Sequence, residues 1–169
     1  MPSLNLEIAQ QRAFSSPEEE AFLNLLRTAD RLRRAFERRT RTWGVTSTQY
    51  NVLRILRGAH PHGLTCAAIG ERMIAAEPDI TRLLARMKKL QLVRQQRDRR
   101  DRRVVRTYIA AAGEELLRSL DPLIRQLPGE LLGHMDAKEL AEMIRLLELA
   151  RQHTEEISGQ DKSGEGQKA

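Results

Sequence analysis

Positive charge in this chain is concentrated in one segment. Residues 82–106 contain eleven lysines and arginines and two aspartates, whereas the whole 169-residue chain has a net charge of +6. The rest of the chain is therefore slightly negative. Such a segment suits a polyanion, because lysine and arginine side chains replace the counterions of nucleic acid phosphates. The alternative interpretation is an ordinary solvated charged surface.

The basic segment divides into an expected helix and an expected hairpin tip. On the helix, an arginine opposite the apolar stripe can bind guanine O6 and N7, and Arg86, Lys88 and Lys89 near its end are expected to meet phosphates. At the tip, arginines can enter a narrow minor groove, whose negative potential attracts them. The candidate DNA-binding residues are Asp79, Thr81, Arg82, Arg86, Lys88 and Lys89 on the helix and Arg99, Arg100, Asp101, Arg102 and Arg103 at the tip.

Cysteine and histidine are too few to indicate catalysis or metal binding. Cys66 is the only cysteine, which excludes an intramolecular disulfide. We expect it to fill space in the structure, and its place near a helix start leaves a sensing role open. His60 and His62 share one loop, but a structural zinc site requires four ligands. No nucleotide-binding loop or hydrolase motif is present either, so we predict no enzyme activity, no metal and no cofactor.

Local start and stop signals predict the elements that position these side chains. Ser16 followed by Pro17 is typical of a helix start, and Thr46 with Gln49 forms a capping-box pattern. Helices are expected from Ser16 to Gly44, from Thr46 to Gly58, from Thr65 to Met73 and from Pro78 to Leu90, and strands from Leu92 to Arg97 and from Val104 to Ile109.

Two short helices joined by a tight turn and followed by a basic hairpin describe a winged helix-turn-helix, so the expected fold class is mainly α. A long helix follows, which Pro122 disturbs and Pro128-Gly129 interrupts or ends, and Asp136 with Glu139 predicts the start of the last helix. The expected organisation is a flexible arm over 1–15, a winged helix-turn-helix domain with dimerisation helices over 16–153, with its DNA-binding lobe at about 46–110, and a disordered tail over 154–169.

The last helix carries a wide apolar stripe. Leu140, Ile144 and Leu147 recur at helical spacing, and Leu146 and Leu149 widen the stripe. One small lobe cannot cover this much apolar surface, which predicts a homodimer.

A second pattern combines Leu92-Val93, Arg97-Asp98, Asp101-Arg102-Arg103 and Gly113. Together with Pro78–Leu84 upstream, it resembles the wing and recognition helix of the MarR-type (multiple antibiotic resistance) regulators, over roughly residues 17–153. The resemblance implies a homodimeric transcription regulator, usually a repressor, that binds a pseudo-palindromic operator. It also implies that the first and last two helices form the dimer interface.

The resemblance extends to single residues. It implies that Asp101 positions Arg103 for the minor groove. One departure is Gln91, which stands where the family has a glycine that favours a left-handed turn. The resemblance further implies a small aromatic or anionic effector between the first helix and the DNA-binding lobe. The candidate residues for that effector are Arg27, Arg31, Arg34, Trp43 and Tyr50. Core packing of the aromatic rings, and arginines that are solvated or paired with nearby carboxylates, are the alternatives.

No apolar run approaches the roughly 20 residues that a membrane span requires, and the N-terminus has no signal pattern. We therefore predict a cytoplasmic protein with no membrane partner. Together with the basic segment, the resemblance implies a ligand-responsive repressor that binds duplex DNA. The alternative function is a winged-helix architectural or protein-interaction module without operator specificity. A small enzyme is disfavoured, because a basic wing has no place in one.

Overall fold

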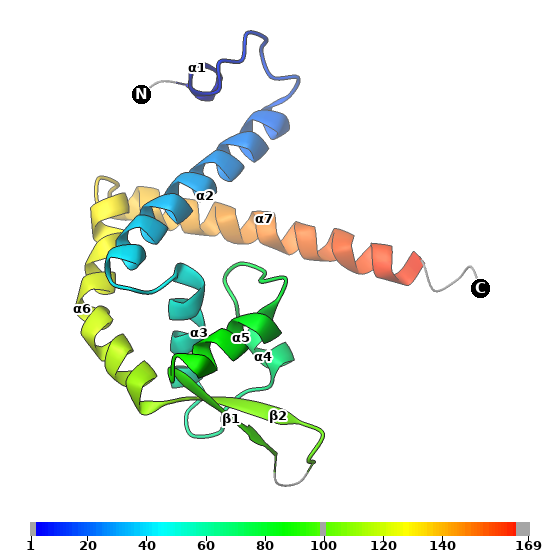
Figure 1. Ribbon diagram of the computed structural model, residues 1–169. Coiled ribbons are helices and arrows are strands. Elements are labelled where there is room, and N and C mark those ends of the chain that lie inside the picture. The colour runs from blue at the N-terminus through cyan, green and yellow to red at the C-terminus, as the bar shows by residue number, and fades with distance from the viewer. Residues whose placement is uncertain (1–2, 99–100, 165–169) are drawn as a thin grey trace. The chain divides into compact units, whose positions relative to one another are not determined.

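The structure is a computed structural model that describes residues 3–98 and 101–164, with side chains up to residue 154. It is mainly helical and contains one two-stranded antiparallel sheet, which confirms the predicted fold class (Figure 1). The chain divides into two compact units, Met1–Leu127 and Pro128–Ala169. The elements are α1 (Leu4–Glu7), α2 (Pro17–Thr42), α3 (Ser47–Gly58), α4 (Cys66–Gly70), α5 (Ile80–Lys89), β1 (Val93–Arg97), β2 (Val105–Ile109), α6 (Ala111–Leu132) and α7 (Ala137–Gly164).

Side-chain caps begin the helices where the sequence predicts them. The Ser16 hydroxyl accepts a hydrogen bond from the backbone N–H of Glu19 at the start of α2 (3.2 Å). Thr46 and Gln49 cap α3 reciprocally, each side chain accepting from the other residue's backbone N–H. These bonds satisfy N–H groups that have no partner inside the helix, so each cap fixes where its helix starts.

The core of the first unit holds α3, α4, α5 and the wing together. Leu53 of α3, Ile69 of α4 and Met87 of α5 are fully buried in it, with Val93 and Ile109 from the two strands. Burying a large apolar side chain contributes about 1.5–3 kcal/mol. The inner stripe of α5 is therefore anchored, and its opposite face stays on the surface.

The wing is fixed at its base by a third extended segment. Strands β1 and β2 pair with Arg94 opposite Tyr108 and with Gln96 opposite Arg106. Leu64 then bonds to buried Thr107 through two backbone hydrogen bonds of 2.9 and 2.7 Å. In Figure 1 the hairpin projects from the lobe that α3, α4 and α5 form.

Several element boundaries differ from the sequence prediction. Helix α5 begins at Ile80, and Pro78 lies outside it rather than in its first turn, because the Asp79 side chain caps the helix. Helix α4 ends at Gly70 instead of Met73. Helix α6 is not interrupted at Pro122 or ended at Pro128. Each proline removes one hydrogen bond, and burial of leucines on the same helix offsets that loss.

Both chain ends contain more helix than the sequence predicts. Residues 4–7, within the expected flexible arm, form α1, in which Leu4 is buried and Glu7 pairs with Arg27 and Arg31. Helix α7 continues to Gly164 instead of ending before the expected disordered tail at 154–169, and neither an apolar stripe nor helix propensity in this segment predicts the extension. Within the described residues, no helix combines the length and apolarity that crossing a membrane needs.

Candidate nucleic-acid interface

The first turn of α5 is organised by Asp79. The Asp79 Oδ1 atom accepts a hydrogen bond from the Arg82 backbone N–H (2.9 Å), which caps the helix. Its Oδ2 atom lies 3.1 Å from Arg82 Nε. Asp79, predicted as a DNA-binding residue, is therefore the N-cap of the helix and the ion-pair partner of Arg82, a second predicted residue.

The other predicted residues of α5 lie on the exposed surface. Thr81, Arg86, Lys88 and Lys89 are exposed, while Leu83, Leu84 and Met87 of the same helix are buried. The Thr81 hydroxyl lies 3.6 Å from the Cys66 thiol, and Cys66 also packs against the core. The structure thus leaves a polar and cationic face of α5 open to solvent.

The wing tip is shaped by two aspartates. The Asp98 N–H donates to the Val104 carbonyl (2.8 Å), and the Val104 N–H donates to the Asp101 carbonyl (3.0 Å). The Asp101 carboxylate accepts from the Arg103 N–H (2.9 Å). Arg102 and Arg103 are exposed at this turn. Arg99 and Arg100 lie outside the described residues.

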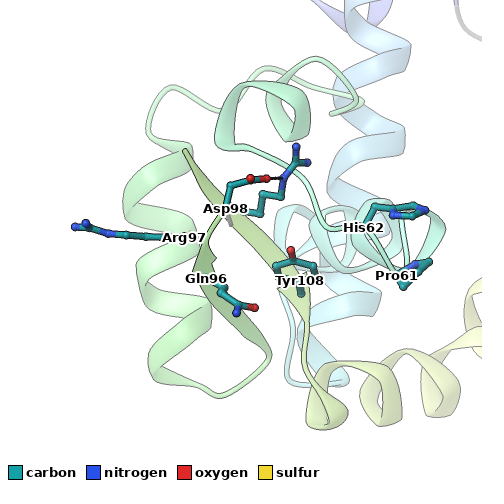
Figure 2. Close-up of a pocket in the computed structure, with 7 residues that line it drawn as sticks. Pro61, His62, Gln96, Arg97, Asp98 and Tyr108 are labelled. Atoms are coloured by element: carbon teal, nitrogen blue, oxygen red, sulfur yellow. Dashed lines mark hydrogen bonds and ion pairs between the residues drawn. The ribbon is translucent and has the colours of Figure 1, made fainter. Parts of the chain in front are cut away.

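Asp98 also ties the tip to β2. Arg106 Nε donates to Asp98 Oδ2 at 2.6 Å, and this hydrogen bond raises the pKa of Arg106 above its ordinary value. Asp98 and Arg106 line a groove of about 630 Å³ on the wing, and Figure 2 shows Tyr108 beside Asp98 in this lining. His62, from the loop between α3 and α4, lines the other side, and the Arg97 side chain extends away from the groove.

The groove offers little to a ligand, because Asp98 and Arg106 are already paired with each other and the Arg97 side chain extends away from it. Over residues 3–98 and 101–164, no group of three or more histidine, cysteine or acidic side chains could hold a metal ion.

The turn between α5 and β1 has the left-handed backbone that the family pattern implies. Gln91 has φ +58°, and the next residue, Leu92, donates its N–H to the Met87 carbonyl (3.0 Å). A residue with a Cβ pays about 1–2 kcal/mol for this conformation. The short connection fixes the wing relative to α5, so both predicted DNA-binding elements belong to one rigid lobe.

The structure gives the predicted effector-binding arginines other partners. Arg27 and Arg31 pair with Glu7, and Arg34 Nε donates to Asp30 (2.7 Å). Hydrogen bonds from Arg34 and Arg33 lower the pKa of Asp30. These contacts match the paired state that the sequence left open as an alternative.

The two predicted aromatic walls also have structural roles. Trp43 is the C-cap residue of α2. Tyr50 packs against Phe36 with ring centroids 6.1 Å apart, and burial raises the pKa of Tyr50.

A different set of residues forms a cavity where α2, α3 and α5 meet. Its volume is about 250 Å³, and none of the five predicted effector residues lines it. The sequence signal that could have located it is Arg41 followed by the hydroxyl run of residues 46–48. The cavity is lined by Glu37, Thr40, Arg41, Thr46, Ser47, Thr48, Glu77, Leu83 and Arg86.

A helix pair joined by residues 71–79, an exposed cationic second helix and an arginine-tipped hairpin on the same lobe define a winged helix-turn-helix protein. The comparisons with known proteins give the family. Residues 43–104 match the sequence model of the MarR family. Transcriptional regulator HosA of Escherichia coli is 30% identical over 113 residues, which cover 64% of this chain and 82% of that protein. The chain belongs to the MarR family and is a DNA-binding transcriptional regulator, not an enzyme.

Solved structures agree with this assignment. The crystal structure of a MarR transcription factor from Planctomyces limnophilus is 42% identical, covers 81% of this chain and 99% of its own, and superposes with a TM-score of 0.61. A mutant MarR from Escherichia coli complexed with operator DNA is 20% identical, covers 88% of this chain and 99% of its own, and has a TM-score of 0.69. The second likeness concerns the fold alone.

Proposed function

We propose that the protein is a homodimeric repressor that binds a pseudo-palindromic operator and releases it when a small ligand binds. The observation that carries this proposal is the pairing of an exposed cationic α5 with an arginine-tipped wing on one lobe. In helix-turn-helix proteins the second helix enters the major groove with its N-terminal residues at base edges. Thr81 and Arg82 occupy that end of α5.

The two elements have different tasks in this proposal. Arg82 reads a base, while Arg86, Lys88 and Lys89 further along α5 contact phosphates, which supply affinity but no sequence information. Arg102 and Arg103 enter the minor groove beside the major-groove site, where negative potential is concentrated. The hydrogen bond from the Arg103 N–H to Asp101 supports this task, because it fixes the backbone from which Arg103 extends.

Exposed apolar residues in each unit support the homodimer. In the first unit, Leu6, Phe22, Leu25 and Leu26 are exposed, with Phe22 at 60%. In the second unit, Ile144, Leu146 and Leu149 of α7 are exposed, with Leu149 at 55%. Contiguous apolar surface of this kind marks a protein interface, and a two-fold dimer matches a palindromic operator.

The cavity at the meeting point of α2, α3 and α5 is the proposed effector site, in place of the five residues expected from the sequence. Arg41 and Arg86 line it together with threonine and serine hydroxyls and with two glutamates, Glu37 and Glu77, of which Glu37 is already paired with Arg33. The two arginines and the hydroxyls are the donors proposed to bind a small anionic ligand. Arg86 also serves as a phosphate contact in this account. A ligand that engages Arg86 withdraws it from the DNA, and the coupling is reciprocal: operator DNA then weakens ligand binding.

Selection of bound sequences from a random duplex library tests the function. The account predicts an inverted repeat with half-site centres about one helical turn apart. An architectural module would enrich no sequence and would bind scrambled DNA equally well.

The effector proposal has its own test. Small aromatic acids should raise the melting temperature of the protein and lower its affinity for the operator. Arg41→Ala should abolish both effects, and binders that leave operator affinity unchanged would contradict the coupling.

A further inference from the structure

We infer that Asp79 is a specificity-determining positioning residue, which holds the Arg82 guanidinium so that it reads a guanine in each operator half-site. The inference rests on the proposed function. It specifies that the base is guanine and that Asp79 orients the Arg82 side chain that contacts it. It combines two contacts made by a single carboxylate in the first turn of α5.

The geometry selects which part of Arg82 remains available. One Asp79 oxygen accepts the Arg82 backbone N–H at 2.9 Å, and the other lies 3.1 Å from Arg82 Nε. The remaining donors of the guanidinium are the two terminal amino groups, which form a planar fork. That fork matches guanine O6 and N7, the two major-groove acceptors of guanine. A base cannot bind the edge of the guanidinium that includes Nε, because the Asp79 carboxylate already lies against it.

The pair lies where solvent and DNA can reach it. The Arg82 side chain is 80% exposed and the Asp79 side chain 49% exposed. An exposed ion pair contributes little to folding stability, so its main consequence is orientational. Free arginine side chains lose rotamer freedom when they bind, and a side chain that is already held loses less.

Arg82 differs in this respect from the other cations of the helix. Within the part of the chain that the structure describes, Arg86, Lys88 and Lys89 form no ion pair with a carboxylate. Asp79 also neutralises one unit of charge beside Arg82. Arg82 is therefore suited to base reading and contributes little to phosphate binding, whereas the other three cations retain their full charge for phosphates.

The test separates the capping role of Asp79 from its hold on Arg82. In Asp79→Ser the serine hydroxyl still caps the helix, because serine is as good an N-cap residue as aspartate. Serine has no carboxylate, so the contact with Arg82 Nε is lost. Random-duplex selection is carried out with the full-length wild type, Asp79→Ser and Arg82→Lys, and the preference at each position is then measured by competition. Thermal unfolding of each variant confirms folding, and Asp79→Asn replaces the serine variant if that one unfolds.

The wild type should enrich one guanine per half-site. Both variants should lower the preference for that guanine by roughly tenfold while retaining the rest of the half-site, because a fork-to-guanine pair is lost. The slope of affinity against salt should not become shallower in Asp79→Ser, because the substitution removes no cation. If Asp79→Ser retains the wild-type preference for guanine while Arg82→Lys loses it, the positioning role of Asp79 would be overturned. Unchanged preference in both would overturn the reading by Arg82. No enriched motif with the wild type would instead refute the proposed function, and the inference with it.

Discussion

Arg57 and Asp121 join α3 to α6 through two parallel hydrogen bonds, from Arg57 Nη1 and Nη2 to the two carboxylate oxygens, at 2.7 and 3.0 Å. The residues are 64 positions apart in the sequence, and both side chains are half-buried. The hydrogen bonds from Arg57 lower the pKa of Asp121, and the same contact raises the pKa of Arg57. These two hydrogen bonds fix α3 of the winged lobe against α6.

Asp121→Asn should destabilise the fold by about 1 kcal/mol at pH 7, because the charged fork is lost. The folded-state pKa of Asp121 lies below its unfolded value, so the stabilisation is present above pH about 4 and disappears as the pH falls through the folded pKa. Urea unfolding at pH 7 and near pH 3 should show a smaller difference between wild type and variant at the lower pH. Glu115→Gln is the matched control, since Glu115 pairs with Arg118 on the exposed surface of α6. An equal loss of unfolding free energy at both pH values would contradict a stabilising role for the Arg57–Asp121 ion pair.

Gly113→Ala should destabilise the protein by about 1–3 kcal/mol, the range for overpacking a core. A Cβ at Gly113 would lie 2.2 Å from the Leu92 carbonyl oxygen and 3.0 Å from Leu53 Cδ2, so α6 would have to move away from the start of β1. Gly129→Ala in the same helix is the control, because its Cβ would meet nothing within 4 Å. Chemical denaturation should show a loss for the first variant and a small gain for the second, since alanine favours a helix by about 1 kcal/mol over glycine. Similar effects of both changes would contradict the packing assigned to Gly113.

The sequence predicted the elements that local chemistry decides. Caps such as Ser16 and the Thr46–Gln49 box involve residues three positions apart, so their consequences can be read directly from the chain. The left-handed turn at Gln91 was implied only by the family resemblance, in which a glycine stands at this position, and the chain adopts that turn without the glycine. Contacts between distant residues could not be predicted, and Arg57 with Asp121 is the clearest case.

In the predicted site, too, features set by local sequence could be predicted and contacts between side chains could not. The exposed face of α5 followed from helical periodicity. The contact of Asp79 with Arg82 Nε could not be predicted from the sequence, because aspartate at that position also serves as a cap. The effector residues were placed by resemblance and by proximity in sequence. Arg27 and Arg31 proved to be partners of Glu7, and that pairing depends on how α1 folds back.

Arg103→Ala should weaken binding on operator and on scrambled duplex alike, because a minor-groove arginine responds to potential and shape more than to base identity. The slope of log affinity against log salt should decrease by about 1, as expected when one cationic contact to DNA is lost. Fluorescence anisotropy titrations over a salt series provide the measurement. Arg118→Ala, an exposed arginine of α6, should change neither quantity. A loss confined to the operator would assign Arg103 to base reading instead.

Phe22→Glu should convert the protein to a monomer, because it places a charge within the apolar surface proposed as the dimer interface. Ile74→Glu is the matched control: Ile74 is equally apolar and is 79% exposed, but it lies in the loop before α5. Sedimentation equilibrium at micromolar concentration should give a dimer mass for the wild type and Ile74→Glu and a monomer mass for Phe22→Glu. A monomeric wild type would remove the structural basis for a palindromic operator.

One homodimer that reads two half-sites with two copies of α5 and the wing should need both half-sites for tight binding. Affinities are compared at one salt concentration for the selected inverted repeat and for the same duplex with one half-site scrambled. Each mismatched base pair costs about 1–3 kcal/mol, so scrambling several positions should lower the affinity by more than about a hundredfold. Equal affinity for the two duplexes would show that the protein does not read two half-sites.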